Sequence, residues 1–297
     1  MGAQLMKGKV WGDYAHKVRF PVFVEPKIDE IRVHVKIENE GSMFLSYAGK
    51  PLANMQFFAY AFTRLAHETG QKEFDCGILV NGNFNDSYRW VRSTRGVPDD
   101  LVDAEVEFSL YDLPGLPYTY KLRRPIIQRF AYQLDGYLRK DYPTAMASAP
   151  NAVLCAGARE VEEQFLYYRS RGLEGAMVKN PEHVYQRGKR TADWLKLKPE
   201  NDADGVVIEI IEAVCGKDQP ELGLREGDKL GRAGSVRLRM EDGSEACAHG
   251  IPHDLGRDMW VRPEKYISQW AEMKYMERDR QGGYRHPTFH RLREGKE

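Results

Sequence analysis

The hydrophobic pattern of residues 1–199 alternates between stretches typical of strands and stretches typical of helices. Apolar side chains at positions 31, 33, 35 and 37 alternate with charged and polar ones, the two-residue period of a half-buried strand. Between residues 55 and 65, apolar side chains recur at spacings of three and four, which predicts an amphipathic helix that ends near Gly70. Further strands are predicted at 43–47, 74–80, 105–111, 175–179 and 194–198, and further helices at 125–139 and 159–171. This mixture predicts an α+β domain.

The pattern changes at residues 199–205, PENDADG, which are polar and turn-prone and are predicted to link two domains. Five short strands are predicted after it, at 206–214, 235–240, 245–249, 269–275 and 288–292, with a short helical stretch near 263–266. Five short strands fit a small barrel, and the five-stranded oligonucleotide-binding (OB) barrel is a common module of that kind. The sequence therefore predicts two domains, residues 1–199 and 200–297.

The composition is that of a folded protein without membrane spans. Hydrophobic residues make up 42% and charged residues 30% of the 297 residues, as in ordinary globular proteins. No apolar run reaches the roughly 18 residues of a membrane span, and the longest one, 205–215, is interrupted by Glu209 and Glu212. The first twenty residues are mixed polar and charged, unlike a secretory signal. We therefore expect no membrane association.

Cysteine spacing and net charge narrow the expectation further. The four cysteines are widely spaced and form no CxxC pair, which argues against a structural zinc site and favours a reducing, intracellular compartment. The 44 basic and 44 acidic residues cancel. This balance argues against a chain that is basic throughout but permits a local basic face.

Candidate chemistry begins at residues 25–32, EPKIDEIR, where Lys27 stands beside an aspartate and an arginine at a strand edge. Charged residues at such an edge are usually on the surface, and for this segment alone that interpretation stays open. Three later segments change the picture: 174–179 (EGAMVK), 194–199 (WLKLKP) and 285–289 (RHPTF). Lys196 and Lys198 stand two apart on a predicted strand, so both ammonium groups share one face, an arrangement that suits a bound phosphate.

These segments, in this order, resemble the covalent nucleotidyltransferases, and within them the small ATP-dependent DNA ligases of short-tailed bacteriophages. The resemblance covers residues 20–295, and the segments 185–207 and 270–295 are especially similar to the phage type. It implies a nucleotidyltransferase (adenylation) domain followed by an OB-fold domain. It also implies an enzyme that seals nicked double-stranded DNA through a lysyl–AMP intermediate, with ATP as AMP donor and Mg²⁺ or Mn²⁺ as the metal. A monomer in the host-cell cytoplasm is expected.

The resemblance assigns the chemistry to specific residues. The KxDG lysine of the family, which attacks the α-phosphorus of ATP, corresponds to Lys27, and Asp29 belongs to the same motif. A free lysine has a pKa near 10.4 and needs activation to be a nucleophile at neutral pH. Nearby positive charges lower such a pKa, and Lys179, Lys196 and Lys198 would supply them while neutralising the phosphates. A divalent cation would orient the pyrophosphate leaving group.

Other residues match family positions that contact the nucleotide. Glu25 matches a position that accepts a hydrogen bond from the adenine amino group, and Glu174 matches a metal-site carboxylate. Tyr111 falls where the family places an aromatic ring on the adenine face, although an ordinary core tyrosine would give the same pattern. Arg32 matches an arginine used on AMP and on the nick. Arg285 matches a motif that closes over ATP.

Three motifs depart from the family pattern. The glycine of KxDG is Glu30 here, and the DGE motif of the family aligns best with residues 81–83, NGN, in which both carboxylates have become amides. An expected arginine is replaced in the pair Ser46-Tyr47. We hypothesise that Glu30 supplies the carboxylate that the DGE motif lost and that it joins Glu174 at the metal site. The alternative is that Glu30 is a solvated surface residue.

Candidates for DNA contact include the basic stretch 187–190, RGKR, just before the Lys196 segment. A charge cluster of this kind is typical of a solvated loop, but in a ligase it would contact ATP phosphates or the DNA backbone. Phosphate contacts give salt-sensitive, sequence-independent affinity, which suits a protein that holds both sides of a nick. The full set of candidates is Arg32, Lys50, Arg187, Lys189 and Arg190.

Two alternative functions follow from the same residues. An RNA ligase or mRNA-capping enzyme also uses covalent nucleotidyl transfer, and a comparison of nicked DNA with RNA ends and GTP separates these enzymes. A nick-binding protein that has kept the fold but lost catalysis would account for the altered positions 30 and 81–83. A covalent AMP adduct on Lys27 would exclude this second alternative.

Overall fold

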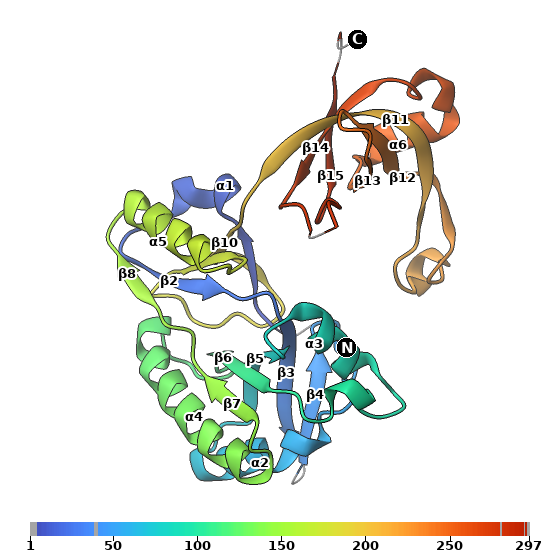
Figure 1. Ribbon diagram of the computed structural model, residues 1–297. Helices are drawn as coiled ribbons and strands as arrows, with labels where there is room; N and C mark the ends of the chain where they lie inside the picture. Colours follow the sequence, from blue (N-terminus) through green and yellow to red (C-terminus); the bar gives the residue numbers. More distant parts are fainter. Residues whose placement is uncertain (1–4, 39–40, 280, 294, 296–297) are drawn as a thin grey trace. The chain divides into compact units, whose positions relative to one another are not determined.

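The computed structural model describes residues 5–38, 41–279, 281–293 and 295. The chain divides into two compact units, Met1–Leu197 and Lys198–Glu297 (Figure 1). The division falls close to the boundary that the sequence predicts after residue 199. In the described residues, no helix is both long and apolar enough to cross a membrane.

The first unit contains two five-stranded sheets. In spatial order the first sheet consists of β1 (Lys7–Val10), β10 (Arg190–Leu197), β9 (Gly175–Lys179), β2 (Val22–Lys27) and β8 (Val153–Cys155). The second consists of β4 (Gly41–Ser46), β3 (Ile31–Glu38), β5 (Glu73–Val80), β6 (Val106–Asp112) and β7 (Ala145–Ser148). Strands β2 and β3 follow each other in the chain but belong to different sheets, so residues 28–30 carry the chain from one sheet to the other.

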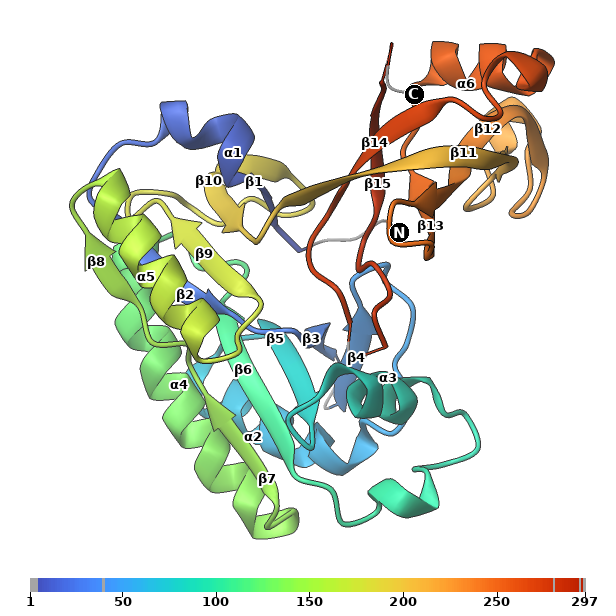
Figure 2. The ribbon, with the colours of Figure 1, turned by 45° about the horizontal axis from the view of Figure 1, so that its top comes forward.

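Helices cover both sheets of the first unit (Figures 1 and 2). Helices α2 and α4 pack against the second sheet and α5 packs against the first. Their bounds are α1 (Trp11–Tyr14), α2 (Ala59–Thr69), α3 (Phe84–Arg92), α4 (Tyr120–Asp141) and α5 (Ala158–Ser170), with short 3₁₀ helices η1 (Ala15–Lys17), η2 (Gln56–Phe58) and η3 (Asp99–Leu101). Helix α2 ends as predicted, at Gly70 in the left-handed conformation, φ 74°.

Side-chain alternation along the second sheet separates its core from its polar face. In β5, Phe74, Cys76 and Ile78 are fully buried in the main apolar cluster, which also contains residues of α2 and α4. Asp75 and Gly77 fall between them and therefore face the opposite side of the sheet. This opposite side is where the polar residues described below gather.

The five strands of the second unit pair in a closed cycle, β11-β12-β13-β15-β14. The core of this barrel is apolar and includes Val207, Val236, Leu238 and Met273, all inaccessible to solvent. The strands are β11 (Asn201–Val214), β12 (Lys229–Met240), β13 (Glu245–His249), β14 (Trp270–Tyr275) and β15 (Thr288–Leu292), accompanied by α6 (His253–Val261), η4 (Pro220–Leu222) and η5 (Pro263–Lys265).

Three element predictions were wrong, for local reasons. The predicted linker 199–205 is largely strand, because β11 begins at Asn201 and pairs with β14 from Asn201↔Tyr275 to Val206↔Trp270. The polar side chains that suggested a linker lie on the more exposed part of that strand. Helix α4 begins at Tyr120, so Pro125, predicted to start the helix, lies inside it. Helix α6 was not predicted, since Gly256 interrupts its pattern; a Cβ atom there would lie 2.7 Å from the Ala233 carbonyl oxygen.

Candidate active site

A pocket in the first unit gathers seven of the fifteen predicted site residues. Four basic side chains (Lys27, Arg32, Lys179 and Lys196) and two acidic ones (Glu25 and Glu30) line it, together with Tyr111. These seven residues come from β2, β3, β6, β9, β10 and the 28–30 connection. The remaining lining residues are Gly8, Pro26, Ile28, Met177 and Trp194.

Lys27 is the last residue of β2 and pairs in register with Gly175 at the start of β9. Its Nζ forms an ion pair with the carboxylate of Glu174, and its carbonyl oxygen accepts a hydrogen bond from the Glu174 backbone N–H at 3.1 Å. The Lys27 side chain is 18% exposed, whereas that of Glu174 is 4% exposed. The Lys27 side chain therefore lines the pocket, and its amine is held by the carboxylate of the residue that immediately precedes β9.

Glu25 and Lys179 form a second ion pair deeper in the pocket, with side chains only 3% and 1% exposed. Lys179 Nζ lies 2.7 Å from Glu25 Oε2, and the Tyr120 hydroxyl donates to the other carboxylate oxygen. Lys179 also donates to the Tyr111 carbonyl oxygen at 3.2 Å and lies 4.5 Å above the Trp194 ring. Burial raises the pKa of Glu25, and the Lys179 ammonium opposes that shift.

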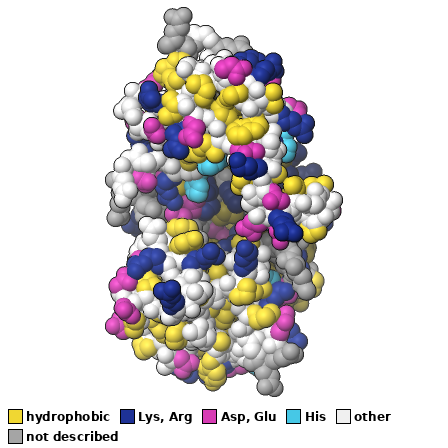
Figure 3. Space-filling view, turned by 90° about the vertical axis from the view of Figure 1, so that its right-hand side faces the viewer, with side chains coloured by type: hydrophobic (Ala, Val, Ile, Leu, Met, Phe, Trp, Pro, Cys, Tyr) yellow, Lys and Arg dark blue, Asp and Glu magenta, His cyan; other side chains and the backbone are white. Residues whose placement is uncertain are grey.

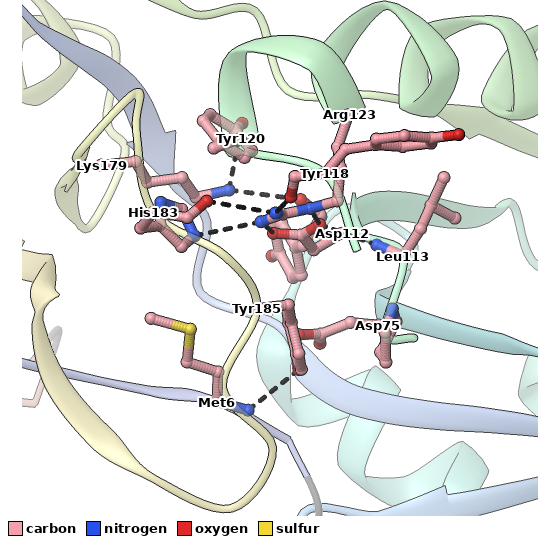
Figure 4. A network of polar contacts seen from close by, with 12 residues as sticks. Met6, Asp75, Asp112, Leu113, Tyr118, Tyr120, Arg123, Lys179, His183 and Tyr185 are labelled. Atoms are coloured by element: carbon pink, nitrogen blue, oxygen red, sulfur yellow. Dashed lines mark hydrogen bonds and ion pairs between the residues drawn. The ribbon is translucent and has the colours of Figure 1, made fainter. Parts of the chain in front are cut away.

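A buried polar network that includes Arg123, Asp112 and His183 lies next to Lys179 and Tyr120 (Figure 4). Arg123 donates twice to the Asp112 carboxylate, at 2.6 and 2.9 Å, and its guanidinium also lies 3.1 Å from His183 Nε2. The Trp194 indole N–H donates to the same His183 nitrogen at 2.8 Å, so that nitrogen is an acceptor. Burial lowers the pKa of His183 to about 4, although Asp112 opposes the shift. His183 is therefore neutral and rigidly placed at neutral pH.

Arg32 is fixed by a second network, also visible in part in Figure 4. Its guanidinium donates to Asp75 at 2.8 and 2.5 Å and to the Met6 carbonyl oxygen at 2.8 Å. The Tyr185 hydroxyl donates to Asp75 at 2.7 Å and accepts from the Met6 N–H at 2.9 Å. Asp75 thus holds Arg32 toward the pocket and ties it to the N-terminal segment.

The N-terminal strand is a part of the site that sequence reasoning missed. Strand β1 runs parallel to β10, and Gly8 lines the pocket. A Cβ atom at Gly8 would lie 2.9 Å from the Trp194 carbonyl oxygen, so glycine permits this close approach. The apolar pattern of β1 is too short to predict a strand. The best available signal was the glycine between two lysines, Lys7 and Lys9.

Glu30 does not lie on the solvated surface, so that alternative is wrong. Both of its carboxyl oxygens are inaccessible to solvent and make no hydrogen bond within the described part of the chain. Burial raises the pKa of Glu30 to about 8; the nearby Ser109 hydroxyl and the Lys27 charge lower it, and Glu107 raises it. The carboxyl group is thus buried near Ser109 and Lys27, and within the described part of the chain neither of its oxygens makes a hydrogen bond of ordinary geometry.

The amides at 81–83 have a structural role instead of a place in the pocket. Asn83 caps α3, since its side chain accepts a hydrogen bond from the Asp86 N–H at 2.9 Å. Asn81 has φ 49° and accepts from the Glu105 N–H at 3.1 Å. Neither residue lines the pocket. The predicted alignment of the DGE motif with residues 81–83 therefore places it at a helix cap outside the pocket.

The remaining predicted site residues lie outside this pocket. Asp29 lies in the connection between β2 and β3, and Lys50 lies in an exposed turn after β4. Arg187 forms an ion pair with Glu73, and Arg190 donates to the Gly8 carbonyl oxygen at 3.0 Å. The exposed Lys189 is joined to β1 through its backbone. Two further predicted residues, Lys198 and Arg285, belong to the second unit, where Arg285 forms an ion pair with Glu277 at 2.9 Å.

Charge and possible metal ligands are both dispersed. On the face shown in Figure 3, basic and acidic side chains are interspersed over each unit, in keeping with the zero net charge. Among the described residues, no group of three or more His, Cys, Asp and Glu side chains is gathered to hold a metal ion. Any cation in the pocket would therefore depend on fewer protein ligands together with a bound phosphate.

Comparison with known proteins identifies the family. The family model described as the ATP dependent DNA ligase domain matches residues 3–198, so the chain belongs to this family. The DNA ligase of Enterobacteria phage T3 is 32% identical over 190 residues, which cover 62% of this chain and 49% of that protein. The DNA ligase of Escherichia phage T7 is 27% identical over 144 residues, 44% of this chain and 40% of the T7 protein. The matched region thus spans half or less of these relatives.

Solved structures support the fold. A structure described as part of a study of DNA binding by Lig E DNA ligases with a minimal scaffold has a TM-score of 0.67 and 18% identity, and covers 99% of both chains. The bacteriophage T7 DNA ligase in complex with ATP has a TM-score of 0.54 and 20% identity, and covers 98% of this chain and 99% of its own. At these identities the likeness shows a mixed α+β fold of the ligase type.

Proposed function

We propose that this chain is an ATP-dependent DNA ligase that seals nicks in double-stranded DNA, and that Lys27 forms the lysyl–AMP intermediate. The observation that carries the proposal is the position of Lys27, which lines a pocket together with an aromatic residue, Tyr111, and three further basic residues. An aromatic face suits a base, and clustered cations suit a triphosphate.

In the first step the Lys27 amine attacks the α-phosphorus of ATP, a P–N bond forms and pyrophosphate leaves. The amine must lose a proton before it attacks. Arg32, Lys179 and Lys196 disfavour a further positive charge in the same pocket, whereas the contact with Glu174 favours it. The Glu174 carboxylate is therefore the group placed to receive the proton as the amine turns toward phosphorus.

The opposite end of the pocket would hold the adenine. Each oxygen of a carboxylate can accept two hydrogen bonds, so Glu25 retains acceptor capacity beyond its bonds to Lys179 and Tyr120. We assign this capacity to the adenine amino group and the Tyr111 ring to the adenine face. The buried network behind Glu25 fixes the acceptor before the base arrives, which lowers the entropy cost of binding.

A divalent cation, when bound, would neutralise the phosphates and orient the pyrophosphate leaving group. Glu174 fits this role because its carboxylate lies beside the attacking amine and a magnesium site needs only one or two carboxylates besides substrate phosphates.

In the later steps AMP passes from Lys27 to the 5′-phosphate of a nick, and the 3′-hydroxyl displaces AMP to seal the strand. We infer that residues 1–197 are the adenylation domain and that the closed barrel of residues 198–297 is an OB-fold that binds DNA. The exposed basic residues Lys50, Lys189 and Arg190 are candidates for phosphate contacts. For Lys198 and Arg285 the role implied by the resemblance stays a prediction.

Incubation with α-labelled ATP and Mg²⁺, followed by denaturing gel analysis and peptide mapping, tests the proposal. The wild-type protein should acquire one AMP on Lys27 and then seal a nicked duplex. Lys27→Ala should acquire none, whereas Lys140→Ala, an exposed lysine at the end of α4, should behave as wild type. Absence of the adduct in the wild-type protein, or an adduct on another lysine, would overturn the proposal and favour a nick-binding protein.

A further inference from the structure

Glu30 is a charged residue of the pocket lining that has no part in the mechanism above. Its two oxygens are buried and unpartnered in the described part of the chain. A buried polar group without a hydrogen bond costs free energy, and native proteins seldom leave one unless a ligand completes it. Glu30 therefore points to a ligand group that donates hydrogen bonds or carries positive charge.

Gly77 provides the space that this carboxyl group occupies. Arg32, Gly77 and Ser109 are directly opposite one another on β3, β5 and β6 and form a row across the polar face of the sheet. A Cβ atom at Gly77 would lie 2.1 Å from Cδ of Glu30. Only one of the positions 30 and 77 can place a side chain here. The φ angle of Gly77 is not positive, so the backbone conformation does not require a glycine there. Glycine is required because a side chain would overlap the Glu30 carboxyl group.

The closeness of Glu30 to Gly77 indicates that the DGE motif of the family corresponds to residues 75–77 and not to residues 81–83. Residues 75–77 of β5 read DCG, so they keep the aspartate of the DGE pattern and end in glycine where the pattern has glutamate. The carboxyl group of Glu30 lies where a side chain at 77 would begin. The two departures, a glutamate for glycine at 30 and a glycine for glutamate at 77, are therefore reciprocal.

We propose that Glu30 is the sugar-recognising residue of the nucleotide pocket and that its carboxyl group, seated over Gly77, accepts hydrogen bonds from the ribose hydroxyls of ATP. The inference rests on the proposed function, because it assumes that adenine binds at Tyr111. Ser109, beside the Glu30 carboxyl group, and Tyr111 are two apart on β6 and share its pocket face. Two strand residues span about 7 Å, close to the separation between a nucleobase and its sugar hydroxyls.

A sugar hydroxyl fits this position better than a divalent cation, the role that the sequence hypothesis gave to Glu30. Four of the pocket side chains are already basic, and no cluster of three acidic or other metal-ligating side chains exists in the described residues. Burial also raises the pKa of Glu30 to about 8, because the ionised carboxylate lacks solvation there, and sugar hydroxyls that donate hydrogen bonds to the carboxylate would favour its ionised form.

The first experiment compares ATP with 2′-deoxy-ATP and 2′,3′-dideoxy-ATP, both in lysyl–AMP formation and in calorimetric binding, which does not need the covalent step. The wild-type protein should prefer ATP over the dideoxy analogue by about 10- to 100-fold, the range of a hydrogen bond to a carboxylate. Glu30→Gln should lose most of that preference, because it loses an acceptor oxygen.

The second experiment uses position 77 to move Glu30 without replacing it. Gly77→Ala should fold, because the displaced group is the end of a flexible side chain, and should lose sugar discrimination as Glu30→Gln does. The two changes combined should lose no more than either alone. The reciprocal variant Glu30→Gly with Gly77→Glu should restore discrimination. Gly136→Ala, on α4 with no atom near its Cβ position, is the matched control and should behave as wild type.

Three results would overturn the inference. One is a wild-type protein that forms lysyl–AMP equally well from ATP and dideoxy-ATP, which would leave the ligase proposal intact. Another is a Glu30→Gln defect that is equal for all three nucleotides and is rescued by added Mg²⁺, which would make Glu30 a metal ligand. The third is full discrimination in Gly77→Ala. If the wild-type protein forms no adduct, the binding comparison still decides the role of Glu30.

Discussion

The two ends of the nucleotide pocket differ in how completely their polar groups are satisfied. The closed end comprises Glu25, Lys179 and Tyr120, which contact one another and are backed by the Arg123–Asp112 pair. The open end comprises Lys27, Glu174 and Glu30, where the Lys27 side chain is partly exposed and the Glu30 carboxyl group makes no hydrogen bond within the residues that the structure describes. The groups of the closed end already satisfy one another, whereas we propose that a bound nucleotide completes the open end.

This contrast separates stability from chemistry within one pocket. Buried charges that are fully paired are costly to disrupt, because removal of one partner leaves the other charge uncompensated. Groups that await a ligand contribute little to folding or oppose it, as strained and unsatisfied functional sites generally do. Substitutions at the closed end should therefore act on the free energy of unfolding, and substitutions at the open end on nucleotide recognition.

The largest effect on stability is expected for Arg123→Met. Both members of the Arg123–Asp112 pair are completely buried, so the substitution leaves an uncompensated carboxylate and should lower the free energy of unfolding by about 3–5 kcal/mol. Urea denaturation followed by circular dichroism measures it. Arg129→Met, an exposed arginine on the same helix, should change stability by less than about 1 kcal/mol. Equal effects of the two variants would contradict the assignment of a rigid closed end.

The next predictions concern how stability depends on pH, because His183 near the closed end and Glu30 at the open end change it in opposite directions. The pKa of His183 is about 4 in the folded protein, below the ordinary 6.5. The unfolded chain therefore binds an extra proton between pH 6.5 and 4, so stability should fall by about 3 kcal/mol as pH is lowered through that window. His183→Gln should reduce this fall, which urea denaturation at pH 7 and pH 4.5 would show.

Glu30 should act in the other direction. Its folded pKa of about 8 lies above the ordinary 4.5, so the folded protein binds the extra proton and stability declines as pH rises from 4.5 to 8. The slope from this group is at most about 1.4 kcal/mol per pH unit. Glu30→Gln should become more stable relative to wild type as pH rises. A parallel pH profile for the two proteins would argue against a buried, unpartnered carboxyl group.

A smaller loss is expected where β1 meets the pocket. Gly8→Ala places a Cβ atom 2.9 Å from the Trp194 carbonyl oxygen, so β1 must shift away from β10 at a cost of about 1–3 kcal/mol. Gly12→Ala is the matched control, since a Cβ atom there meets no atom within 4 Å. Thermal unfolding of the two variants distinguishes them, and identical melting temperatures would show that β1 does not need the close approach.

The smallest effect on folding, with a clear effect on binding, is expected for Tyr111→Leu. Loss of an aromatic ring that stacks on a base costs about 1–3 kcal/mol of binding, which corresponds to an ATP dissociation constant raised about 5- to 150-fold. Tyr111→Phe keeps the ring and should bind as wild type does. Calorimetric titration measures both. Unchanged ATP affinity in Tyr111→Leu would show that the Tyr111 ring does not contact the adenine and is an ordinary core residue.

Much of the fold could be predicted because its strands and helices carry strong local patterns. The alternation from Ile31 onward became β3, and the three-four spacing that ends at Gly70 became α2. The patterns failed where local composition misleads, as in the polar first residues of β11, whose strand pairing is decided by β14. Strand β1 has too few residues to show a period and is held by β10.

The candidate site divides in the same way. Residues of short linear motifs, Lys27, Glu25 and Lys179 among them, could be predicted because their spacing along the chain is informative. The supporting groups could not, because Arg123 and His183 meet Asp112 and Trp194 only after distant segments fold together. The DGE motif was aligned with the wrong residues, 81–83, because its correct place depends on which residues are opposite each other on neighbouring strands, and the sequence alone does not show this.

The glutamate seated over a bare glycine backbone also constrains how this sequence arose. With any side chain at position 77, an acidic group at 30 would have been forced into another rotamer, so a mutation at 30 that came first would have gained no benefit from its present location. A stepwise route to the present pair that never crowds this place passes through glycine at both positions. Reconstructed ancestral sequences would show whether that route was taken.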